Sequence, residues 1–152
     1  MKHPVHPMIV HFPIVGWTVT FFGDVYQYFY GFKYSDIIQI VVTASCILAV
    51  IAIAAGLFDY MRQKPTKTVI SAFEKHMYWA LSAFVVFSIR ALMPQLASVE
   101  TLQLACLISS GLGFIILFYA AKLGGELVYR HGMGRDIGAA QSGSATNNDK
   151  SS

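Results

Sequence analysis

Three of the chain's five histidines lie in its first eleven residues, in the stretch HPVHPMIVHFPI. An imidazole gains or loses a proton near neutral pH, and its neutral ring binds transition metals. Two imidazoles from different helices suit the iron of haem b, and three suit zinc, copper or non-haem iron. The chemistry to consider is therefore proton or metal binding, at a place set by the elements that carry these rings.

The chain that carries the histidines is too apolar for a water-soluble domain of 152 residues. Of these residues, 55% are hydrophobic and 12% are charged, and the mean hydropathy is +0.54. Four stretches approach the length of about 20 apolar residues that a membrane helix needs. They predict an all-α, up-down-up-down bundle of four transmembrane helices within residues 1–135, with spans of about 8–30, 36–58, 72–93 and 99–123.

The two ends of the chain differ in character. The first apolar segment has no A-x-A cleavage pattern, so we expect a retained helix rather than a signal peptide. Residues 136–152 are small and polar, which predicts a disordered tail.

Local signals suggest where the helices begin and end. The first helix has two candidate starts: Pro7 in its first turn with a kink at Pro13, or an extended segment followed by Pro13 in the first turn. Ser71 and Glu74 form a capping box, which predicts that the third helix begins near residue 72. The pair Gly124-Gly125 predicts the end of the fourth helix.

The flanking charges predict the orientation. Four spans place both termini and the middle loop on one side, which carries Lys2, Arg62, Lys64, Lys67, Lys75, Lys122, Arg130 and Arg135. The other side has Lys33, and Arg90 if its long side chain extends outward. The positive-inside rule then places both termini in the cytoplasm. The basic residues on this side, in contact with anionic lipid, explain the net charge of +3. Nucleic acid is therefore not an expected partner.

With this topology, the histidines and several charged residues gather at the cytoplasmic face. Placing an ionisable group at the edge of the hydrocarbon region costs free energy, so such groups commonly belong to a functional site. We expect His11 and His76 to be ligands, with His6 as a third, and Asp59 as the carboxylate that orients a ring. The same face also receives the polar residues that follow the fourth helix, Glu126, Arg130 and His131.

Plainer roles are open for each of these residues. The histidines can serve simple interfacial hydrogen bonding, and Asp59 can pair with Arg62, Lys75 or Arg130. His6 and His11 are five residues apart, about 140° around a regular helix, so both rings face one ligand only if the segment bends.

A second polar cluster is expected at the other end of the bundle. Asp24 lies 13 residues beyond His11 and Arg90 lies 14 beyond His76. At 1.5 Å per residue the two charges reach the same depth on helices that run in the same direction. They can form a bidentate ion pair there, or extend separately into the headgroups.

The sequence leaves three classes of function. One is a protein that binds haem or a transition metal and exchanges electrons with a redox partner. The second is a non-catalytic membrane subunit or homo-oligomer whose polar motifs serve packing and docking. A proton-coupled carrier is less favoured, because neither an inverted repeat nor a broken mid-membrane helix is visible. No HExxH, CxxCH, P-loop or GxSxG motif indicates an enzyme.

The motifs HPMIVHFPI, GLFDY and GGELVYRHGMG, with His76 early in the third helix, resemble a family of bacterial four-helix membrane proteins, domain of unknown function 2231. The resemblance covers residues 6 to about 134, and Arg135 stands where the family usually has valine. It implies a bacterial inner membrane. The family's recurrent polar positions map onto His6, His11, Asp59, His76, Arg90, Glu126, Arg130 and His131. Some members are fused to cytochrome c or Rieske modules, which implies a redox neighbourhood.

Overall fold

The computed structural model describes residues 6–31, 33–62 and 67–131. The described part is all-α, as predicted. Its elements are α1 (His6–Ile9), α2 (His11–Tyr30), α3 (Ser35–Met61), α4 (Lys67–Leu92), a short 3-10 turn (Met93–Gln95) and α5 (Gln103–His131). The tail predicted for residues 136–152 lies outside the described residues.

The first helix begins at His6 and is interrupted at Val10. Proline has no N–H to donate, and its ring crowds the carbonyl four residues earlier. Pro13 therefore leaves the carbonyl of Ile9 without its helical partner, whereas Val10 keeps helical dihedral angles and α2 follows α1 directly. Of the two starts that the sequence left open, the structure has the one with Pro7 in the first turn, and Pro13 removes one helical hydrogen bond.

Two predicted helix boundaries are wrong. The helix α4 begins at Lys67, ahead of the capping box, and its first turns pack on α3 through the stacked rings of Phe73 and Tyr60, 4.0 Å apart. The helix α5 continues through Gly124 and Gly125 to His131, because Leu127 beyond them is still buried in the bundle.

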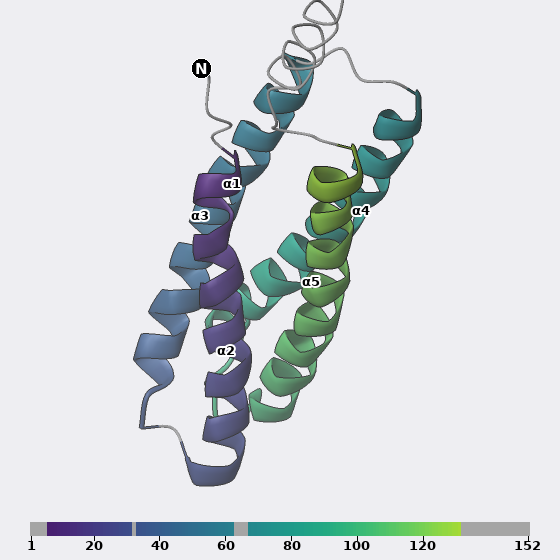
Figure 1. The fold of residues 1–152 in the computed structure, drawn as a ribbon. Helices are drawn as coiled ribbons and strands as arrows, with labels where there is room; N and C mark the ends of the chain where they lie inside the picture. Colours follow the sequence, from purple (N-terminus) through teal and green to yellow (C-terminus); the bar gives the residue numbers. More distant parts are fainter. Residues whose placement is uncertain (1–5, 32, 63–66, 132–152) are drawn as a thin grey trace, which may run out of the picture.

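The four long helices form a closed ring in the order α2, α3, α4 and α5, with α5 also against α2 (Figure 1). The diagonal pair α2 and α4 meets at the centre, where Trp17 and Phe87 stack with ring centroids 4.9 Å apart and planes only 2° apart. Small residues allow this close packing. A Cβ on Gly113 of α5 would lie 2.8 Å from the ring of Phe87.

Within the described part of the chain, three helices are long and apolar enough to cross a membrane: Ser35–Met61, Lys67–Gln95 and Gln103–Arg130. The 20 residues of α2 are not among them, and this helix carries Thr20, Asp24 and Gln27 on its buried face. These polar side chains face the other helices rather than the outside of the bundle. That α2 forms the first span stays a prediction.

Candidate functional site

His6 is held against α3 by contacts of its backbone and its ring. Its backbone N–H donates to Asp59 Oδ2 over 3.1 Å, and its ring Nδ1 lies 2.7 Å from the carbonyl oxygen of Ala52. The ring covers Gly56, where a Cβ would lie 2.9 Å from Nδ1. A larger residue at position 56 would therefore push the imidazole away from its carbonyl partner.

His76 is held against α5 in the same manner. Its Nδ1 lies 3.0 Å from the carbonyl oxygen of Ala120. Its ring covers Gly124, where a Cβ would lie 3.0 Å from Cε1. The glycine that the sequence suggested as a helix end thus provides the space for an imidazole.

These contacts fix the tautomer of both rings. A carbonyl oxygen only accepts hydrogen bonds, so Nδ1 carries the hydrogen in His6 and in His76. In a neutral ring the lone pair is then on Nε2. Metal-binding histidines are commonly arranged in this way, with the second ring nitrogen donating to a carbonyl or a carboxylate. The arrangement thus leaves two Nε2 atoms in the form that binds a metal or a proton.

The side chains expected to form the site, those of His11 and His76 with Asp59 and His6, are not placed as a metal-binding group in the described part of the chain. His11 is exposed on α2, whereas His6 lies against α3. Among the described residues no group of three or more His, Cys, Asp or Glu side chains is placed to hold a metal ion. The five-residue spacing gives the physical reason, because Val10 keeps helical dihedral angles and the two rings therefore stay about 140° apart around the helix. His6 and His76 are the two histidines whose rings are held against the neighbouring helices.

Asp59 contacts the backbone of His6, and its expected role in orienting a ring stays a prediction. Its carboxylate accepts the backbone N–H of His6 at the start of α1, whereas the ring is oriented by the carbonyl of Ala52. A carboxylate is unfavourable at the C-terminal end of its own helix and favourable at the N-terminal end of another. The contact therefore satisfies Asp59 and fixes the beginning of α1.

The remaining predicted residues lie at the same end of the bundle. Glu126 is half-buried on α5 and Arg130 is exposed. His131 is the last residue of α5, and its side chain lies outside the described part of the chain.

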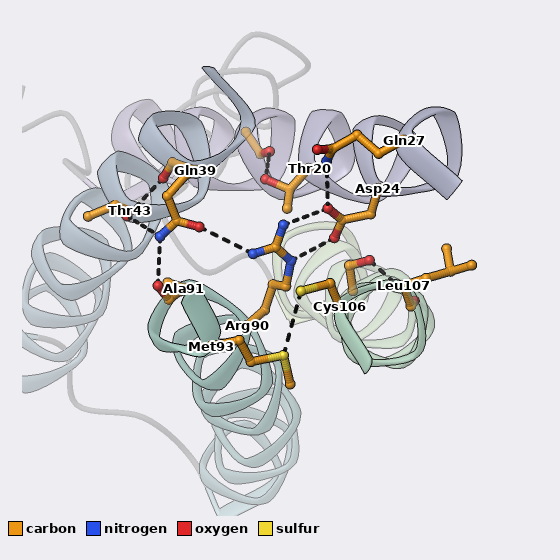
Figure 2. Close-up of polar contacts among 12 residues, drawn as sticks. Thr20, Asp24, Gln27, Gln39, Thr43, Arg90, Ala91, Met93, Cys106 and Leu107 are labelled. Carbon is orange, nitrogen blue, oxygen red and sulfur yellow. Dashed lines mark hydrogen bonds and ion pairs between the residues drawn. The ribbon is translucent and has the colours of Figure 1, made fainter. Parts of the chain in front are cut away.

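The charge pair predicted for the opposite end is present. Arg90 Nη2 lies 2.6 Å from Asp24 Oδ1 and Arg90 Nε lies 2.8 Å from Oδ2, which is the bidentate geometry (Figure 2). The Arg90 side chain is 1% exposed and the Asp24 side chain 2%. Neither side chain extends separately into the headgroups. Helices α2 and α4 therefore have the relative depth that the sequence predicted.

Two amides complete this cluster and were not predicted. Gln39 of α3 accepts a hydrogen bond from Arg90 Nη1 over 3.2 Å and donates to the carbonyl oxygen of Ala91 over 2.7 Å (Figure 2). Gln27 donates to Asp24 over 3.4 Å. A signal was available for Gln39, because it is an amide within the otherwise apolar stretch of the second predicted span.

The fold and these two clusters define a helical membrane protein with a pair of histidines at one end and a buried ion pair at the other. Residues 2–136 match the family described as a predicted membrane protein, DUF2231, and the chain belongs to this family. The family resemblance seen in the sequence is confirmed. No curated protein and no solved structure matches the chain.

Proposed function

We propose that this membrane protein binds a metal-containing redox cofactor, a haem or a transition metal ion, through Nε2 of His6 and His76. The observation that carries the proposal is the pair of Nδ1 contacts to the carbonyls of Ala52 and Ala120. Each contact orients a ring and leaves its Nε2 as the ligand atom. The cofactor would supply one-electron chemistry, and the protein would hold it near one membrane surface.

The charge distribution supports a cytoplasmic position for this site in a bacterial inner membrane. Arg90 is buried against Asp24, so Lys33 is the basic residue left near the opposite face, against eight on the histidine side. This difference favours the histidine end as the cytoplasmic one. A redox protein that docks there, or a second copy of the chain, would be the electron partner.

The test is the cofactor content of the purified protein, measured by its visible absorption and by metal analysis. Asparagine at positions 6 and 76 is the most informative change, because its amide can still donate to the carbonyl as Nδ1 does, and it has no Nε2. We expect a Soret band or stoichiometric metal in the wild-type protein and its loss in His6→Asn/His76→Asn. His11→Ala is the matched histidine control.

A second candidate function is that of a non-catalytic membrane subunit. The observation that favours it is that both imidazoles fill the space above a glycine and hydrogen-bond within the chain, as packing residues do. On this reading the wild-type protein is colourless, contains no metal and binds neither added hemin nor added copper or zinc. The asparagine variants then change only the stability of the bundle.

A further inference from the structure

The buried faces of α3 and α5 match position by position. The helix α3 buries Ile38, Val42, Ser45, Ala49, Ala52 and Gly56. The residues 68 positions later are Cys106, Ser110, Gly113, Leu117, Ala120 and Gly124, of which the first five are buried and the last is half-buried. Both helices therefore turn the same face inward over the same length.

Helices α2 and α4 match at three of the five buried positions of α2, with a shift of 70 positions. The buried residues Pro13, Trp17 and Thr20 correspond to Ala83, Phe87 and Arg90, which are also buried. Trp17 and Phe87 are equivalent positions and stack on one another. Equivalent residues that touch each other mark the position of a two-fold axis.

The order of the helices fits such an axis. A half-turn about the long axis of the bundle exchanges α2 with α4 and α3 with α5. It turns the α2–α3 contact into the α4–α5 contact and the α3–α4 contact into the α5–α2 contact, and all four contacts are present (Figure 1). The two helical hairpins are therefore related as parallel repeats are in membrane proteins.

The histidines and everything that holds them follow the same relation. His76 is 70 positions after His6, as α4 is to α2. Their carbonyl partners Ala52 and Ala120, and the glycines beneath the rings, are 68 positions apart, as α5 is to α3. The two imidazoles are thus equivalent groups on either side of one axis.

We propose that the chain is a duplicated helical hairpin, and that His6 and His76 are the two halves of one site that binds the iron of a haem, with one imidazole on each face. This deepens the proposed function and rests on it. The symmetry supplies two equivalent ligand atoms, and the described residues supply no third ligand group. A bare zinc ion takes four ligands and at least three from the protein. The iron of a tetrapyrrole receives four nitrogens from the ring and needs only two axial ligands from the chain.

The experiment is a hemin titration of the full-length protein in detergent micelles, followed by absorption and electron paramagnetic resonance. The wild-type protein is expected to bind one hemin in a six-coordinate, low-spin state. His6→Asn and His76→Asn should each lose the low-spin signal and give a five-coordinate, high-spin complex. The two variants should bind hemin with similar affinity to each other. Added imidazole should restore the low-spin signal in both variants, and His11→Ala should behave as the wild type.

The outcomes separate the two proposals. If hemin binds but only one of the two asparagine variants loses the low-spin state, the equivalence is overturned and the proposed function stands. If the wild-type protein binds zinc or copper but not hemin, the haem assignment is overturned alone. If the wild-type protein binds none of these probes, the proposed function is overturned as well. Far-UV circular dichroism of each variant shows whether the bundle has folded.

Discussion

The buried ion pair predicts a large energetic coupling between α2 and α4. In Asp24→Asn the guanidinium of Arg90 remains buried and charged, and it loses the carboxylate that accepts its two shortest hydrogen bonds, of 2.6 and 2.8 Å. In Arg90→Gln the carboxylate of Asp24 keeps only the contact of 3.4 Å from Gln27 among the side chains shown in Figure 2. Removing one partner of a buried pair costs about 3–5 kcal/mol of unfolding free energy.

The double variant Asp24→Asn/Arg90→Gln should lose much less than the sum of the two single variants. It leaves no uncompensated charge, and its two amides can hydrogen-bond with each other and with Gln39. Replacing both members of a buried ion pair is often nearly neutral. If each single variant loses at least about 3 kcal/mol and the double variant loses almost nothing, the coupling free energy is about 6 kcal/mol, above the usual range of about 0.5–3 kcal/mol for residues in contact.

The assay is reversible unfolding in mixed micelles of mild and denaturing detergent, followed by circular dichroism, for the wild-type protein and the three variants. Asp36→Asn is the control, since this carboxylate is exposed in the first turn of α3. Its loss should cost only the interaction with the helix dipole, about 0.3–1 kcal/mol. Strict additivity of the two single variants would refute the reasoning, because it would mean that the buried charges do not interact.

Three further expectations concern packing and topology. Gly124→Ala should lower the unfolding free energy by displacing the ring of His76. Gly125→Ala, whose Cβ meets nothing within 4 Å, should be neutral or stabilise the protein by up to about 1 kcal/mol through helix propensity. Equal effects of the two variants in the same unfolding assay would contradict this. Gly113→Ala should also destabilise, since its Cβ would lie 2.8 Å from the ring of Phe87, and Phe87→Leu should recover part of the loss. A reporter at the C-terminus should be cytoplasmic and one in the 94–100 loop periplasmic, and the reverse result would overturn the charge argument.

Much of the fold follows from the sequence because membrane helices have few options. The apolar lengths predict the four long helices, and the rise per residue predicts that Asp24 and Arg90 share a depth. The sequence allowed either an ion pair between them or separate extension of the two side chains into the headgroups. The burial of both side chains shows that the ion pair forms. A charged side chain that reaches another helix of the bundle avoids the cost of exposure to hydrocarbon.

The histidine site was only partly predictable. The end of the bundle at which the rings gather follows from topology, but the ring that faces inward depends on how the first helix is rotated and on whether it starts before Pro7 or at Pro13. A proline can either kink a helix or begin one, and the sequence does not distinguish these cases. The acceptors of the rings are backbone carbonyls of Ala52 and Ala120, which have no signature in the sequence.

The two clusters have opposite relations to the symmetry of the bundle. His6 and His76 occupy equivalent positions, whereas Arg90 corresponds to Thr20 and Asp24 corresponds to Pro94. Two copies of the first half facing each other would bury two Asp24 carboxylates, and two copies of the second half would bury two guanidiniums. Uncompensated buried charges of this kind cost several kcal/mol. The ion pair therefore favours the association of the unlike halves of one chain, and that association places the two equivalent imidazoles at the same end of the bundle.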